Sequence, residues 1–257
     1  MSLHMLSFRP NFIRLSSLAA KERLLPPGGD AGYALHAVFT ASFGELAPKP
    51  FLLLPPGVPG GGPAGRLLAY SRASLHDLVT RAGAFADPAF SNVLDLPAAE
   101  EKAMPGAYIA GTRFGFRLRV RPVIRTGKPR PEEAADGQQT GGKARERDAY
   151  APGGETDERP LDARGRAYAI WLAAQFSRLG GASVESTALE SFCQTRLITR
   201  DRSGDQGRST SSNGPDAILS GILRIDDGPR FAELLARGIG RHRAFGFGML
   251  LLRPPGG

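Results

Sequence analysis

The chain has 257 residues, a formal net charge of +8, 33 glycines and 21 prolines. This length suits one large domain or two of roughly 100–130 residues each, and the glycines and prolines indicate generous loops. A single cysteine, Cys193, excludes a disulfide framework and a cysteine-rich zinc site. No apolar run approaches the roughly 20 residues that span a bilayer, and the first residues lack the features of a signal peptide. We therefore expect a cytoplasmic protein without membrane contact.

Positive charge is concentrated outside one segment of the chain. Between Gly127 and Pro160, six Lys or Arg stand against eight Asp or Glu, a net charge of −2. The whole-chain charge of +8 therefore leaves +10 for the remaining residues. An excess of this size is expected where the partner is a polyanion such as a nucleic acid, although a basic protein without such a partner fits the charge equally well.

The first hundred residues predict the order β-α-β-β-α-β. Two segments with apolar residues at helical spacing, 33–43 and 74–85, are expected to be helices, the second with Ser74 as its N-cap. Strands are expected at the remaining apolar segments, which are residues 3–13, 51–57, 65–72 and 90–96. This order is that of a ferredoxin-like domain, an arrangement that RNA-recognition modules also use.

The second half repeats this order with insertions. Residues 112–125 alternate apolar side chains with arginines and predict a strand, and residues 161–180 predict an amphipathic helix. The elements expected after that helix are one long strand or a hairpin, a loop, a strand, a helix and a last strand, at residues 182–200, 200–216, 217–226, 228–238 and 247–254.

We therefore expect an α+β fold of two tandem ferredoxin-like (RRM-like, βαββαβ) domains, residues 1–100 and 106–257. The second domain carries an insertion at residues 127–160, which are polar and rich in Gly and Pro and are expected to form a long loop or finger.

The segment GIGRHRAFGFG, residues 238–248, combines four glycines with three basic side chains. Phosphate-binding loops of nucleotide enzymes precede a helix, so that its N-terminus faces the phosphate. Here the loop follows a predicted helix, whose C-terminal dipole disfavours anions. Phosphate binding would therefore depend on side chains, which disfavours a nucleotide-dependent enzyme. A tight turn with solvated arginines is the alternative.

The spacing G-x-G-x(5)-G-x-G, with basic and aromatic residues between the glycines, resembles the C-terminal signature of RAMP-superfamily CRISPR proteins. The most similar group is CasE, a group of endoribonucleases. Tyr33-Ala-Leu-His36 resembles the Tyr-x-x-His at the start of that family's first helix, and FRLRVRP at 116–122 resembles the strand that opens its second domain. The resemblance covers most of the chain. Long insertions at 127–160 and 201–215 depart from it, and a type IV crRNA endonuclease related to CasE fits them about as well.

The resemblance implies an endoribonuclease that recognises the stem-loop of CRISPR repeat RNA, cleaves pre-crRNA and stays bound to the crRNA among other subunits of an effector complex. The chain has four histidines and no His or Cys cluster with metal-binding spacing, so we expect no metal and no other cofactor. The 2′-OH of the RNA would attack the adjacent phosphate and leave a 2′,3′-cyclic phosphate. Such cleavage needs a base, an acid and cations near the phosphate.

The resemblance makes His36 and Tyr33 catalytic candidates. Histidine titrates near neutrality, so His36 would act as base or acid, and Tyr33 on the same helical face would orient the 2′-OH or the phosphate. Arg23 would clamp the scissile phosphate. If His36 is dispensable, Arg23, Arg241 and Arg243 would act by electrostatic stabilisation. Without the resemblance, each of these residues is as readily an ordinary helix or loop residue.

A second set of candidates would bind RNA by charge. No Asp or Glu occurs from Thr112 to Arg130, and such a basic ribbon suits an A-form stem that is recognised through its shape and phosphates. The candidates in this ribbon are Arg113, Arg117, Arg119, Arg121, Arg125, Lys128 and Arg130. Those in the glycine loop are Gly238, Gly240, Arg241, His242, Arg243, Gly246 and Gly248.

Two further interpretations remain open. A non-catalytic RAMP subunit with the same fold would bind guide RNA without cleaving it. A plain RNA-binding module with two RNA-recognition-like domains would expose aromatic side chains on its central strands, whereas the segment FGFRLRV interleaves arginines.

Overall fold

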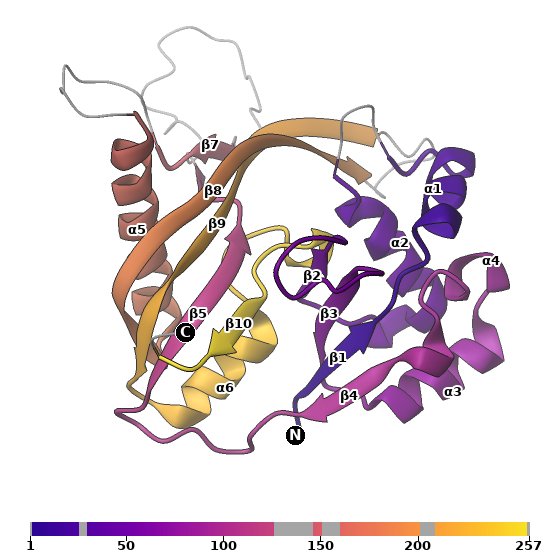
Figure 1. Ribbon diagram of the computed structural model, residues 1–257, viewed down its shortest axis with the longest axis horizontal. Coiled ribbons are helices and arrows are strands. Elements are labelled where there is room, and N and C mark those ends of the chain that lie inside the picture. Colours follow the sequence, from indigo (N-terminus) through magenta and orange to yellow (C-terminus); the bar gives the residue numbers. More distant parts are fainter. Residues whose placement is uncertain (1, 26–29, 126–145, 151–159, 201–208, 256–257) are drawn as a thin grey trace, which may run out of the picture.

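The computed structural model describes residues 2–25, 30–125, 146–150, 160–200 and 209–255. In this part of the chain, two antiparallel four-stranded sheets lie side by side, each with helices packed against it (Figure 1). The expected α+β fold of two ferredoxin-like halves is confirmed. No helix among these residues is both long and apolar enough to cross a membrane.

The first sheet has the strand order β2-β3-β1-β4, in which the first strand lies between the third and the fourth. Its predicted second helix begins as expected, because Ser74 and Asp77 form a reciprocal capping box. The elements of this half are β1 (His4–Phe8), α1 (Phe12–Lys21), α2 (Gly32–Phe43), η1 (Gly44–Leu46), β2 (Phe51–Leu54), β3 (Arg66–Ser71), α3 (Leu75–Phe85), α4 (Pro88–Ser91), η2 (Leu96–Ala98) and β4 (Glu100–Ala103).

Two predictions in this half are wrong. Residues 90–96 are not a strand, because Asp87 caps the short helix α4 and Pro88 occupies its first position. The fourth strand is β4, whose exposed, charged sequence EEKA has no apolar alternation to reveal it. The strand expected at 3–13 ends at Phe8, because Asn11 is the N-cap of helix α1, which was not expected. Since β4 pairs with β1, we propose that the first domain extends to Ala103 rather than ending at residue 100.

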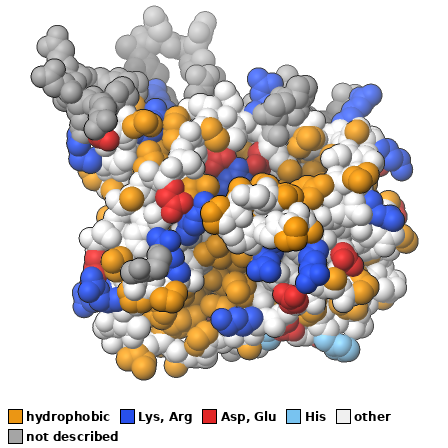
Figure 2. Space-filling view, viewed as in Figure 1, with side chains coloured by type: hydrophobic (Ala, Val, Ile, Leu, Met, Phe, Trp, Pro, Cys, Tyr) orange, Lys and Arg blue, Asp and Glu red, His pale blue; other side chains and the backbone are white. Residues whose placement is uncertain are grey.

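Strands β2 and β3 are buried on both faces, which explains their nearly continuous apolar sequences. Alternate residues, such as Phe51 and Leu67, pack against the helices of the first half. The residues between them, such as Leu52 and Leu68, belong to the core of the second half. The two halves therefore share a core, and Figure 2 shows hydrophobic side chains gathered between them on one face.

The second sheet has the order β10-β5-β9-β8, which repeats the arrangement of the first. A separate two-stranded ribbon pairs β6 with β7. The elements of this half are β5 (Arg113–Val120), β6 (Val123–Arg125), β7 (Glu146–Asp148), α5 (Pro160–Leu179), β8 (Ala182–Arg200), β9 (Ser209–Ile225), α6 (Gly228–Arg237), η4 (Arg243–Phe245) and β10 (Leu250–Arg253).

Strands β8 and β9 form one long ribbon that arches over the molecule towards α2 (Figure 1). Two register shifts, at Val184/Ser186 and at Leu189/Ser191, add the irregularities that bend such a ribbon. The alternative of a single strand at 182–200 is confirmed. The expected loop at 200–216 is wrong for residues 209–216, because β8 pairs their backbone despite their polar composition. Of the predicted insertion 127–160, the structure describes only 146–150 and 160.

The two halves are joined by a largely buried arrangement of one arginine and two aspartates. The Arg119 guanidinium donates to Asp216 at 2.5 Å and 3.0 Å and to Asp30 at 2.6 Å. The other carboxylate oxygen of Asp30 accepts the backbone N–H of Gly32, the first residue of α2, at 2.7 Å. The start of α2 is therefore tied to the centre of the second sheet.

Replacing Arg119 by methionine should destabilise the fold strongly. Asp216, only 6% exposed, would keep its charge without its main partner, and such a loss costs about 3–5 kcal/mol. The measurement is the free energy of unfolding in urea. Arg113→Met is the matched control on the same strand. Its side chain is 57% exposed and pairs with Glu185, so its loss should cost less than about 1 kcal/mol. Equal effects of the two substitutions would contradict the assigned role of Arg119.

Candidate active site at the glycine loop

The glycine loop, residues 238–248, closes on itself between α6 and β10. The Ile239 N–H donates to the Gly248 carbonyl at 2.9 Å, and the Gly248 N–H donates to the Arg119 carbonyl at 2.7 Å. Gly248 has φ +79°, and a Cβ there would collide with the carbonyl oxygen of Ile239. Glycine is therefore required at this position. Gly238 caps the C-terminus of α6, as predicted.

The short helix η4 brings Phe245 of this loop against α2. The Phe245 ring stacks on Tyr33 at a centroid distance of 6.0 Å and meets the His36 ring edge-on at 5.0 Å. On the loop itself, the His242 ring lies 6.2 Å from Phe245. Gly32 permits this approach, because a Cβ at that position would collide with the carbonyl oxygen of Phe245. The structure thus brings Tyr33, His36 and His242 around one aromatic ring.

Glu146 of β7 holds the basic residues at the tip of the loop. Its carboxylate forms a hydrogen bond of 2.9 Å with Nε2 of His242 and an ion pair with Arg241. The hydrogen bond from His242, with the charges of His242 and Arg241, outweighs burial and lowers the pKa of Glu146 to about 2. This residue was missed in the sequence because it lies in the polar segment 127–160, where no periodicity distinguishes one carboxylate from another.

The remaining catalytic candidate, Arg23, lies elsewhere. It is exposed in the segment between α1 and α2, with φ +52°, and so precedes the helix that carries Tyr33 and His36. Its role at the scissile phosphate stays a prediction, as do those of the other two residues.

Two arginines of β5 are paired with acidic residues of β8, which lies beyond β9 in the sheet. Arg113 pairs with Glu185 at 2.5 Å, and Arg117 pairs with Glu190 at 2.8 Å. Their charges are therefore partly compensated, and RNA contact by them stays a prediction. The carboxylates come from β8, which lies much later in the sequence than the acid-free segment 112–130.

Two further arginines of the ribbon are not accessible as expected. Arg119 is held between two aspartates, and Arg121 is only 2% exposed and donates to the carbonyl oxygen of Thr195 at 3.1 Å. A phosphate could reach neither guanidinium without displacing these partners. Arg125 is exposed on β6, and RNA contact by it stays a prediction. Lys128 and Arg130 lie outside the described residues.

The geometry offers acid–base groups and cations rather than a metal site. Among the described residues, no group of three or more His, Cys, Asp or Glu side chains could hold a metal ion. Histidine and tyrosine side chains around a loop with Arg241 and Arg243 suit proton transfer next to a phosphate.

The Glu146 carboxyl should titrate far below its ordinary range. Its pKa should be about 2 instead of 4.5. Because the folded-state pKa is lowered, the stabilisation is complete above about pH 4.5 and is lost as the pH falls towards 2. NMR titration of the labelled side-chain carboxyl measures this pKa directly. His242→Ala should raise it towards 4.5, and an ordinary pKa in the unsubstituted protein would contradict the hydrogen bond.

Several solved structures share this fold. The CRISPR endoribonuclease Cse3 bound to a 19-nucleotide RNA matches 99% of this chain and 100% of its own, with 18% identity and a TM-score of 0.61. Cas6e from Escherichia coli str. K-12 matches the same shares with 18% identity and a TM-score of 0.54. A chain of a CRISPR RNA-guided surveillance complex, pre-nicking, matches 98% of this chain and 99% of its own, with 15% identity and a TM-score of 0.53.

A comparison with curated proteins gives no match. A family model described as "CRISPR associated protein" matches residues 12–254, which include every strand of the two sheets except β1, the α2 residues and the whole glycine loop. The expected relationship to CRISPR proteins is thereby confirmed, and the chain belongs to this family of CRISPR associated proteins.

Proposed function

We propose that this protein is an endoribonuclease that recognises the stem-loop of CRISPR repeat RNA and cleaves pre-crRNA at the 3′ base of the stem. The observation that carries the proposal is the meeting of Tyr33, His36 and His242 around Phe245 of the glycine loop. The fold shared with an RNA-bound CRISPR endoribonuclease supports it.

In the proposed reaction, the 2′-oxygen forms a bond to the adjacent phosphorus while the bond from phosphorus to the 5′-oxygen breaks. A base takes the proton of the 2′-OH, and an acid gives a proton to the leaving 5′-oxygen. The products are a 2′,3′-cyclic phosphate and a 5′-OH end. No metal-activated water is needed as the nucleophile, because the attacking group belongs to the RNA itself.

The contact between His242 and Glu146 supports one division of these roles. The imidazole of His242 bonds to the Glu146 carboxylate through Nε2, which places the proton on that nitrogen and leaves Nδ1 to accept the proton of the 2′-OH. His36 on α2 supplies the proton for the 5′-oxygen, and Tyr33 orients the phosphate. Arg241 and Arg243 stabilise the negative charge that develops in the transition state.

We further propose that the protein keeps the cleaved crRNA and joins other subunits of an effector complex. The likeness to a chain of an RNA-guided surveillance complex supports this partner class. Arg113, Arg117 and Arg125, which lie on one sheet and the adjoining ribbon, are candidates for phosphate contacts to the stem.

The protein should cleave the repeat RNA of its own host in the presence of EDTA and should only bind the same RNA with a 2′-deoxy sugar at the cleavage position. Both results follow from attack by the 2′-OH without a metal ion. Denaturing gels measure cleavage, and end-group analysis identifies the cyclic phosphate. Tight binding without cleavage of either RNA would instead support a non-catalytic guide-RNA subunit.

His36→Ala should slow cleavage by a factor of about 10²–10⁴. A substrate with sulfur in place of the leaving 5′-oxygen should restore much of this rate, because a thiolate leaves without protonation. His242→Ala should slow both substrates alike, since it removes the base. Rescue of His242→Ala but not of His36→Ala would overturn the assignment. Tyr33→Phe, which keeps the ring against Phe245, removes only the hydroxyl and should slow both substrates if that hydroxyl orients the phosphate.

A further inference from the structure

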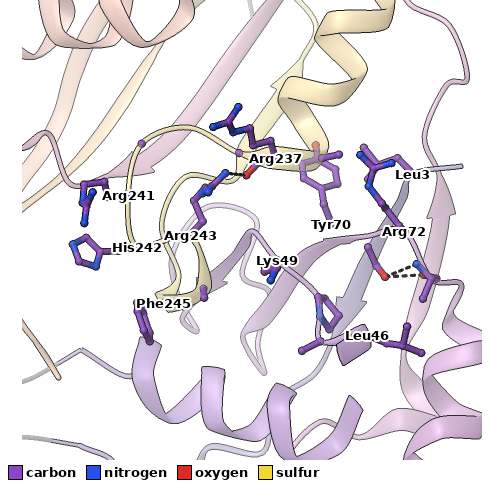
Figure 3. A pocket seen from close by; sticks show the side chains of 18 of the residues that line it. Leu3, Leu46, Lys49, Tyr70, Arg72, Arg237, Arg241, His242, Arg243 and Phe245 are labelled. Carbon is purple, nitrogen blue, oxygen red and sulfur yellow. Dashed lines mark hydrogen bonds between the residues drawn. The ribbon is translucent and has the colours of Figure 1, made fainter. Parts of the chain in front are cut away.

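A cavity of about 870 Å³ lies beside the glycine loop, between α5, α6 and the first sheet. Figure 3 shows its basic side chains around one space, with Arg237 and Arg243 on one side and Arg72 on the other. We call it the basic cavity; its cationic side chains are Lys49, Arg72, Arg178, Arg237, Arg241 and Arg243. No Asp or Glu occurs among the described residues that line it.

The cations of the basic cavity are poorly compensated within the described structure. Arg72 pairs with Glu233 and Arg241 with Glu146, both outside the lining. The guanidinium of Arg243 donates instead to the backbone carbonyl of Arg237 at 2.6 Å. Burial lowers the pKa of Arg243, and the positive charges of Arg237 and Arg178 lower it further. A bound anion would reduce the repulsion between these like charges.

The lining and position of the cavity favour an unpaired RNA strand. His242 and Phe245 line the cavity and also border the candidate active site, which makes the two continuous. Apolar walls that include Leu46 and Leu179 alternate with the cations, as in sites that hold both bases and phosphates of single strands.

We propose that the basic cavity binds the unpaired RNA strand that flanks the stem next to the cleavage position, through its phosphates. This inference rests on the proposed function and extends it, because it assigns a substrate contact to Arg178 and Arg237, neither of which belongs to the acid–base site. The contact would hold the strand on the far side of Phe245 from Tyr33 and His36.

The test compares the binding of three RNAs by fluorescence anisotropy over a series of salt concentrations. They are the repeat stem-loop alone and the stem-loop with unpaired nucleotides on its 5′ or its 3′ side, each with a 2′-deoxy sugar at the cleavage position. The variant is Arg178→Gln with Arg237→Gln, both exposed side chains. The matched control is Arg166→Gln with Arg230→Gln, which removes one arginine from each of the same helices, α5 and α6, outside the cavity lining.

The unsubstituted protein should bind one flanked RNA more tightly than the stem-loop alone. The variant should lose this gain and keep its affinity for the stem-loop alone. For the flanked RNA, the dependence of log K on log salt concentration should become shallower by about 1.4, which is 0.7 for each phosphate contact. The control should keep the gain. No gain from either flank, or equal loss in variant and control, would overturn the basic cavity as a strand site. Cleavage of unmodified repeat RNA, measured in parallel, separates this result from failure of the proposed function.

Discussion

The ion pairs of Arg119 with Asp30 and Asp216 are the constraint on which the candidate site depends. They connect three segments that no local interaction would bring together: the segment before α2, the central strand β5 and the strand β9. The backbone of Arg119 also receives the hydrogen bond from Gly248. One residue thus fixes both the helix that carries Tyr33 and His36 and the loop that faces them.

Arginine serves two different purposes in this molecule. On β5, guanidinium groups are paired with carboxylates of β8, of β9 and of the segment before α2, and these pairs join strands of the sheet and the two halves. Around the glycine loop, several cations face an open cavity without acidic partners in its lining. The net charge of the chain therefore does not show where a ligand would meet positive charge. The arginines of β5 are paired, whereas the cations beside the glycine loop face the cavity.

Elements with a local signal could be predicted from the sequence. The capping box at Ser74, the alternation along β5 and the C-cap at Gly238 are each set by neighbouring residues. The exposed strand β4 and the polar start of β9 have no such signal, since they owe their conformation to pairing with β1 and β8.

The same distinction applies to the site. Tyr33 and His36 were expected from the resemblance and His242 as an RNA-binding residue of the glycine loop, and the structure brings the three together. Glu146 and the pairing of the β5 arginines could not be expected, because each depends on a partner from a distant strand. Tertiary contacts, and not residue type, decide which of these charges remain available to a ligand.

The order in which the elements occur along the chain has a consequence for synthesis. Helix α2 is made before the glycine loop, and β10, which completes the second sheet beside β5, follows that loop. A chain still on the ribosome therefore carries Tyr33 and His36 without the loop that faces them. The candidate site is complete only after both halves have been synthesised.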